Sequence, residues 1–265
     1  MDNNADLTAM TLSSPLMSAP CKRGRPSVKF LPLGDTALTV EFAESIDRDT
    51  NAQVLMLDAR ITHAELDGVI EAVPTFRSLT VHYDPSITSA MDLQAEIEEL
   101  SSTKAAVQTR ERTWRIPVCY EGSCAPDLAE VAERLDLTIN EVIEYHSSVR
   151  YFVYMIGFLP GLPYLGELPA EIDLPRRQHP RVRVPPGSVA IAAGLTTIYP
   201  YESPGGWHLL GRTPIPLFSL DLEPPSLLAP GDTVQFEPVS HSHHDRLSGM
   251  DIREVSEQFA ERVDP

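Results

Sequence analysis

Four arginines gather in one short stretch of this acidic chain: Arg176, Arg177, Arg181 and Arg183. The whole chain has a formal net charge of −17 at pH 7, whereas residues 150–212 hold six basic and four acidic side chains, which is +2. Guanidinium groups bind carboxylates and phosphates through paired hydrogen bonds, so a positive segment in an acidic protein predicts an anionic ligand. The alternative interpretation is that these arginines pair with carboxylates elsewhere on the chain, and for the cluster both stay open.

His146 is a candidate catalytic proton carrier, because it ends a predicted helix that leads into the arginine-rich stretch. The C-terminus of a helix favours the imidazolium form, and imidazole gains or loses a proton near neutral pH. The alternative is a histidine that bonds a carbonyl at the helix end. The run His241-Ser-His-His-Asp245 is typical of metal-binding tracts. It follows the last predicted strand in a polar segment, so we expect a solvent-exposed tail and no metal site.

The turn Glu202-Ser-Pro-Gly-Gly206 is a candidate binding loop. Gly205 and Gly206 lack a Cβ, so a ligand can approach their backbone closely. Exposed N–H groups in such a turn can hold a carboxylate or phosphate. Tyr164 and Trp207 can form an apolar wall beside it. The alternative is an ordinary barrel turn with the tryptophan in the core.

Composition excludes several classes of protein. The 42% hydrophobic and 22% charged residues are those of an ordinary globular chain, and the acidic charge argues against nucleic-acid binding. No apolar run is long enough to span a membrane, and the start lacks the features of a signal peptide, so we expect a cytoplasmic protein. Walker A, Rossmann, HExxH and GxSxG motifs are absent, so catalysis cannot rest on a self-contained set.

These residues need a scaffold, and the remaining pattern predicts an α+β chain. Residues 1–29 are predicted to be a disordered tail, and residues 30–120 a ferredoxin-like α/β domain. The predicted order there is β-α-β-β-α-β, the split βαβ arrangement, with an antiparallel sheet behind two helices. The predicted strands are residues 37–42, 68–73, 78–83 and 113–119, and the helices are residues 47–61 and 89–101.

The second half predicts a barrel. Residues 121–149 are predicted to be a helical linker of two short helices, the second opening with the capping box Thr138-Ile-Asn-Glu141. Within residues 150–240, short strands alternate with fixed turns, and 14 of the 24 prolines lie between Pro160 and Pro230. This pattern is typical of a closed β-barrel. Residues 241–265 are predicted to be a polar tail that includes a candidate terminal helix.

Several rare motifs occur in one order along the chain. They are His82-Tyr-Asp-Pro85, Gly157-Phe-Leu-Pro-Gly161, Pro163-Tyr-Leu-Gly166, Pro185-Pro-Gly-Ser-Val-Ala190, Glu202-Ser-Pro-Gly-Gly-Trp207 and Gly211-Arg-Thr-Pro214. Through them, residues 30–240 resemble the family of PxpB (a subunit of bacterial 5-oxoprolinase), allophanate hydrolase subunit 1 and KipI. The same unit forms subdomains C and D of the carboxyltransferase domain of urea carboxylase. The resemblance implies a small α/β domain followed by a cyclophilin-like β-barrel.

The resemblance also implies a function. It implies a cytoplasmic subunit that pairs with a larger homologous subunit (PxpC-like) and a third subunit (PxpA-like). That complex uses ATP, with Mg, to open the cyclic amide 5-oxoproline to glutamate, so we expect this chain to be inactive alone. One alternative is a KipI-like regulatory protein that inhibits a histidine kinase. Another is a carboxyltransferase or allophanate hydrolase component of urea metabolism, with no biotin attached to this chain.

Overall fold

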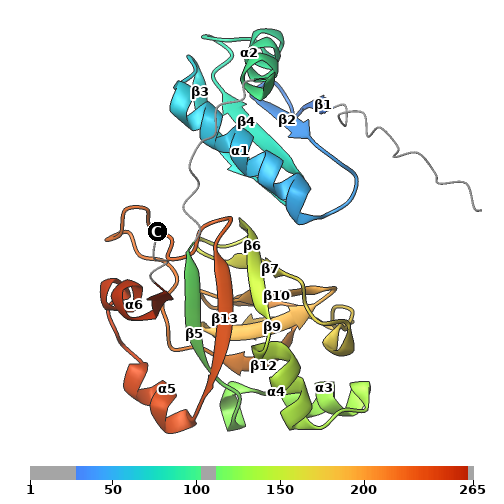
Figure 1. Cartoon of the computed structure of the whole chain (residues 1–265), viewed down its shortest axis with the longest axis vertical. Helices are drawn as coiled ribbons and strands as arrows, with labels where there is room; N and C mark the ends of the chain where they lie inside the picture. Colours follow the sequence, from blue (N-terminus) through green and yellow to red (C-terminus); the bar gives the residue numbers. More distant parts are fainter. Residues whose placement is uncertain (1–27, 103–111, 262–265) are drawn as a thin grey trace, which may run out of the picture.

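The computed structural model describes residues 28–102 and 112–261. Figure 1 shows two units, a small sheet with two helices formed by the first part of the chain and a barrel formed by the rest. The predicted tail at residues 1–29 lies almost entirely outside the described residues. Within those described ranges, no helix combines the length and the apolar character needed to cross a membrane.

The first unit is an antiparallel sheet in the strand order β1-β2-β4-β3. Its elements are β1 (Lys29–Pro32), β2 (Ala37–Glu41), α1 (Arg48–Ala64), β3 (Val69–Pro74), β4 (Ser78–Tyr83) and α2 (Ala90–Ser102). Strand β4 alternates buried and half-buried residues, so Leu79 and Val81 share one apolar core with Val54 and Ile61 of α1. The alternation predicted for this strand and the helical spacing predicted for α1 are therefore confirmed.

The second unit is a closed, mixed barrel in the order β12-β9-β10-β7-β6-β13-β5, with β5 paired again to β12. Its strands are β5 (Thr113–Cys119), β6 (Arg150–Ile156), β7 (Pro163–Gly166), β9 (Ser188–Ala192), β10 (Leu195–Ile198), β12 (His208–Arg212) and β13 (Thr233–Val239). Strand β8 (Arg181–Val184) pairs with β11 (Ser203–Gly205) in a separate small sheet. Ile116, Val153 and Leu165 lie in the core that fills the barrel. The predicted barrel is confirmed.

Strand β5 belongs to the barrel, and here the structure departs from the split βαβ prediction. It pairs in parallel with β13 over its whole length. Trp114, Ile116 and Val118 are fully buried in the barrel core, which explains why the strand is held there. The first sheet instead has β1 at the edge beside β2. The boundary between the two units therefore falls before residue 113 and not at residue 120.

Two helices occupy the predicted linker, α3 (Leu128–Leu135) and α4 (Ile139–Ser147). The predicted capping box is present, because Thr138 Oγ1 accepts from the Glu141 N–H at 3.2 Å and Glu141 Oε2 accepts from the Thr138 N–H at 2.7 Å. Val131 and Val142 lie in the barrel core. The two helices cap one end of the barrel (Figure 1), so this segment is part of the barrel unit.

The C-terminal segment is folded, in contrast to the predicted polar tail. Helices α5 (His241–Leu247) and α6 (Ile252–Phe259) lie beside the barrel, and β14 (Ala260–Glu261) pairs with β5 (Figure 1). Ile252 and Val255 are one helical turn apart and both are buried. This apolar spacing anchors α6 despite its polar composition.

Candidate functional site

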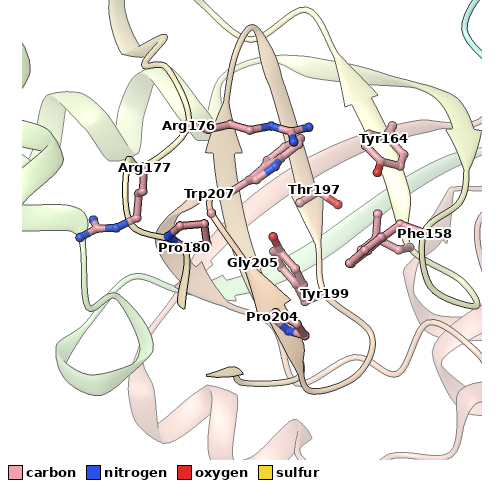
Figure 2. A pocket seen from close by; sticks show the side chains of 12 residues that line it. Phe158, Tyr164, Arg176, Arg177, Pro180, Thr197, Tyr199, Pro204, Gly205 and Trp207 are labelled. Carbon is pink, nitrogen blue, oxygen red and sulfur yellow. The ribbon is translucent and has the colours of Figure 1, made fainter. Parts of the chain in front are cut away.

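A pocket of about 180 Å³ opens between β7, β10 and the turn that precedes β12. Four aromatic residues line it: Phe158, Tyr164, Tyr199 and Trp207 (Figure 2). Tyr164 meets Trp207 edge-on, with ring centroids 6.2 Å apart. Trp207 is almost buried, whereas Phe158 is 67% exposed at the mouth. Tyr164 and Trp207 therefore form one wall of the pocket, as the sequence predicts.

Arg176 is the predicted arginine whose side chain faces this pocket. Its guanidinium carbon lies 5.8 Å from the centre of the Trp207 ring, a position in which the aromatic face attracts a cation. Figure 2 shows Arg176 reaching over Trp207, while its neighbour Arg177 points away from the pocket. Within residues 28–102 and 112–261, no carboxylate forms a salt bridge with Arg176. Its charge is therefore available to a ligand.

Arg177 and Arg181 are held by a buried carboxylate at the start of α3. Asp127 is 2% exposed, accepts from Arg181, and lies 3.5 Å from Arg177 Nη1. Its second oxygen accepts from the Leu209 N–H at 2.7 Å. Arg177 also donates to Glu130 at 3.0 Å, and this hydrogen bond raises the pKa of Arg177. We call Asp127, Glu130, Arg177 and Arg181 the Asp127 anchor, because they tie α3 to β8 and β12.

Arg183 pairs with Glu202 at the surface of the small β8–β11 sheet. The guanidinium donates to both carboxylate oxygens, at 3.0 and 2.8 Å, and the hydrogen bond from Arg183 lowers the pKa of Glu202. Neither residue lines the pocket. Pairing with carboxylates, the alternative left open for the cluster, therefore describes Arg177, Arg181 and Arg183, while Arg176 keeps its charge at the pocket.

Gly205 and Gly206 line the pocket opposite the aromatic wall. A Cβ on Gly205 would lie 2.5 Å from the Tyr199 hydroxyl, so the close approach of these two groups requires glycine. The carbonyl of Gly206 accepts from the Arg177 N–H at 2.7 Å. This bond fixes the turn against the loop that carries Arg176.

The comparison with known families decides the relationship of the chain. A family model described as the carboxyltransferase domain, subdomain C and D, matches residues 28–228. The chain belongs to this family. It is 40% identical over 223 residues to the 5-oxoprolinase subunit PxpB of Bacillus subtilis, covering 80% of this chain and 93% of that one. We refer to it below as the carboxyltransferase C–D unit.

Two further relatives are longer than this chain. The urea amidolyase of Lachancea kluyveri is 27% identical over 279 residues, and the match covers 92% of this chain but 15% of that enzyme. The crystal structure of TTHA0988 is 38% identical with a TM-score of 0.69, covering 77% of this chain and 40% of that one. The C–D unit thus occurs both as a separate chain and within longer proteins.

In this carboxyltransferase C–D unit, His146 lies in the barrel core and not in the pocket. It is fully buried and stacks on Phe236, with ring centroids 4.6 Å apart. Its Nδ1 lies 2.7 Å from the Tyr120 hydroxyl, and its Nε2 lies 3.0 Å from Thr196 Oγ1. Because Thr196 Oγ1 donates to the Ala190 carbonyl, Nε2–H donates to Thr196 and Nδ1 accepts from Tyr120.

This network holds a neutral imidazole. Burial lowers the pKa of His146 to about 3, and a proton on Nδ1 would leave the Tyr120 hydroxyl without its acceptor. A proton carrier must lie within hydrogen-bond reach of the reacting group, and His146 does not line the pocket. The geometry therefore favours a structural histidine over the catalytic role that the sequence predicts.

Three pocket residues escaped the sequence analysis: Phe158, Thr197 and Tyr199. Phe158 has a φ of +69°, in the left-handed region that bulky side chains rarely adopt. Burial raises the pKa of Tyr199 to about 12, so its hydroxyl keeps its proton and can donate a hydrogen bond. Phe158 and Tyr199 each lie next to Gly or Pro, and aromatic residues in such turns were the available signal.

The described residues include no group of three or more His, Cys, Asp or Glu side chains arranged to hold a metal ion. His241 and His244 instead share the Asp245 carboxylate, each at 3.2 Å. They belong to α5, and His244 is 8% exposed. The histidine run therefore forms part of a folded helix.

Proposed function

We propose that this chain is a subunit of an ATP-dependent 5-oxoprolinase-type amide hydrolase, and that its pocket binds the carboxylate of 5-oxoproline. The family and the similarity to a protein named as a 5-oxoprolinase subunit support the class of reaction. The observation that carries the binding role is Arg176, whose guanidinium stands over Trp207 at the pocket without a carboxylate partner among the described residues.

The shape and lining of the pocket suit a small acid. Its volume of about 180 Å³ is below the roughly 300–1,000 Å³ of pockets for larger, drug-sized ligands. Arg176 would hold the carboxylate by charge-assisted hydrogen bonds. The Tyr164 and Trp207 rings would contact the methylene groups of the lactam. Tyr199 keeps its proton and is a candidate donor to a ligand oxygen.

This chain alone does not fit a Mg–ATP site. A triphosphate carries several negative charges, but the neighbouring Arg177 and Arg181 are already paired with Asp127. Within the described ranges, no cluster of acidic or histidine side chains could hold a metal ion. We therefore assign ATP and Mg to a larger homologous subunit, which with a third subunit would complete the complex. In the complex, ATP cleavage supplies the free energy that opens the lactam.

The test compares two arginine variants in the complex reconstituted with its partner subunits. Arg176→Ala should raise the KM for 5-oxoproline about 10- to 100-fold, because hydrogen bonds to a charged group contribute about 1.5–3 kcal/mol and about 1.4 kcal/mol is tenfold. Arg183→Ala is the matched control, since it removes the same charge from a surface pair outside the pocket. The readout is 5-oxoproline-dependent ATP cleavage. Equal KM values for both variants would exclude the binding role of Arg176.

A second function rests on a different observation. Exposed apolar side chains lie on the loops and on β8 of the barrel unit: Phe158, Val182, Tyr201 and Leu220. Exposed apolar side chains favour a protein partner when they form one patch, which suits a neighbouring subunit and equally a KipI-like regulator of a histidine kinase. Direct kinase binding, together with no turnover in the reconstituted complex, would support the regulator. Turnover with urea-derived amides instead of 5-oxoproline would support the urea-metabolism alternative.

A further inference from the structure

The first unit reaches the pocket wall through one aromatic side chain. Phe76 lies in the turn between β3 and β4, outside the core of its own unit. Its ring contacts two barrel tyrosines, Tyr154 at 5.6 Å and Tyr164 at 5.7 Å between centroids. The contact with Tyr164 is edge-on, with an interplanar angle of 74°. Since Tyr164 lines the pocket, Phe76 lies directly behind the pocket wall.

The turn that carries Phe76 is fixed to both units. Asn51 of α1 is fully buried, and its amide donates to the carbonyls of Thr75 and Phe76 at 3.0 and 3.1 Å. The same amide nitrogen lies 3.2 Å from the Tyr154 carbonyl of β6. The Thr75 N–H also donates to the Ser78 carbonyl at 2.8 Å, which closes the turn. Phe76 is therefore presented on a rigid loop that is bonded to the barrel.

A second contact holds the far end of the same barrel strand. Strand β7 contains Tyr164 and is followed directly by Glu167. Both carboxylate oxygens of Glu167 accept from Arg48 at the start of α1, and the Arg48 guanidinium also lies 5.1 Å from the centre of the Phe152 ring. Glu167 has a φ of +72°, a conformation that must be maintained by its surroundings. The first unit thus touches β7 at two points.

We infer that the first unit sets the geometry of the pocket by clamping β7, with Phe76 as a positioning residue for Tyr164. Tyr164 is packed between Phe76 on one side and Trp207 on the other. Without Phe76, the Tyr164 ring can turn away from Trp207, and the wall that faces Arg176 loosens. The identity of the bound acid rests on the proposed function, whereas the clamp rests on these contacts alone.

The chain contains two tryptophans, which allows a test without substrate. Incorporation of 5-fluorotryptophan gives one ¹⁹F resonance from Trp207 in the pocket and one from Trp114, which is fully buried in the barrel core. Trp207→Phe assigns the two resonances. Phe76→Ala should shift or broaden the Trp207 resonance and leave the Trp114 resonance in place, while Phe76→Leu should give a smaller change.

Phe30→Ala is the matched control, because Phe30 is a half-buried phenylalanine of the same sheet that packs in the core of the first unit. General loosening of that unit would move Trp207 in both variants, whereas the clamp predicts a change for Phe76 alone. Arg48→Ala should produce a change in Trp207 similar to that of Phe76→Ala. An unchanged Trp207 resonance in folded Phe76→Ala and Arg48→Ala would overturn the inference.

The same variants in the reconstituted complex separate the two proposals. Phe76→Ala should raise the KM for 5-oxoproline at least about tenfold with little change in kcat, because a misplaced wall weakens binding of the ligand. If Trp207 moves but the parent complex shows no 5-oxoproline-dependent ATP cleavage, the clamp holds and the proposed function fails. If Arg176→Ala raises KM while Phe76→Ala changes neither KM nor Trp207, the proposed function holds and the clamp fails.

Discussion

The barrel unit contains two adjoining polar regions that differ in how their groups are satisfied. In the enclosed region, Asp127 holds Arg181, and the His146 ring is bonded at both nitrogens. In the pocket, Arg176 and Tyr164 face open space. Adjacent residues in the sequence fall on different sides, since Arg176 faces the pocket while the next residue joins the Asp127 anchor. A buried partner therefore distinguishes a structural arginine from one that can bind a ligand.

The physical basis of this difference is desolvation. An ionised group that loses water must recover the lost interactions from fixed partners, and removal of one partner leaves the other group with an unmet cost. Groups of the enclosed region should therefore control stability. Groups of the pocket should control ligand affinity and leave stability almost unchanged. The following predictions test this division in order of decreasing effect.

Asp127→Ala should have the largest effect on stability. The change leaves Arg181 and the Leu209 N–H, both partners of this carboxylate, without their acceptor. Breaking a buried ion pair costs about 3–5 kcal/mol, and we expect the lower end, about 3 kcal/mol, because 27% of the Arg181 side chain is exposed. The measurement is the free energy of unfolding in urea, followed by circular dichroism.

Two variants control for this result. Asp127→Asn keeps an oxygen that can accept one of the two hydrogen bonds, so its loss of stability should be smaller. Arg183→Ala breaks an exposed pair and should leave the urea midpoint unchanged. If Asp127→Ala were as stable as Arg183→Ala, the distinction between the enclosed region and the surface pairs would be lost.

His146 predicts a pH dependence of stability. Burial holds its pKa near 3 in the folded chain, compared with about 6.5 for an unfolded histidine. The unfolded chain therefore binds the proton more tightly, so this contribution is fully present above pH 6.5 and is lost as pH falls from 6.5 towards 3. The expected loss is about 1.4 kcal/mol per pH unit in that window.

His146→Gln isolates this term from the titration of carboxylates. Glutamine can still accept from Tyr120 and donate to Thr196, but it does not titrate. The difference in unfolding free energy between parent and variant should shrink as pH falls below 6.5, and parallel curves would contradict the assignment. A large loss of kcat with unchanged folding would restore the catalytic role predicted from the sequence.

Local patterns in the sequence predicted much of the fold. The alternation of Leu79 and Val81 and the capping box at Thr138 are short-range signals, and both match the structure. The placement of β5 could not be predicted in this way. Its partner β13 lies more than a hundred residues later in the chain, and an alternating strand fits either sheet equally well. Long-range pairing depends on packing that no local pattern records.

The candidate site shows the same limit. Aromatic residues and glycines in proline-rich turns indicated Tyr164, Gly205 and Trp207, because such turns fix the backbone around a pocket. The roles of the arginines depended on Asp127 and Glu130, which lie on a distant helix. Charge counted along the sequence therefore found the right segment but could not separate Arg176 from its neighbours.

Two adjacent glycines provide the finest test of the division between regions. A Cβ on Gly205 would lie 2.5 Å from the Tyr199 hydroxyl and 3.0 Å from a Val184 methyl. A Cβ on Gly206 would have its nearest neighbour, Pro180, at 3.6 Å, an ordinary contact. Gly205→Ala should therefore cost about 1–3 kcal/mol of unfolding free energy through overpacking, while Gly206→Ala should leave stability near that of the parent.

The KM for 5-oxoproline in the same two variants shows which side of the pocket accommodates the added methyl group. Tyr199 is almost buried, so the group that it meets at Gly205 sits at the border between the enclosed region and the pocket. If Gly205→Ala lowers stability and raises KM together, the wall at Tyr199 is packed as rigidly as the core. If KM rises while stability is unchanged, Tyr199 moves into the pocket, and the border between the two regions lies behind this tyrosine.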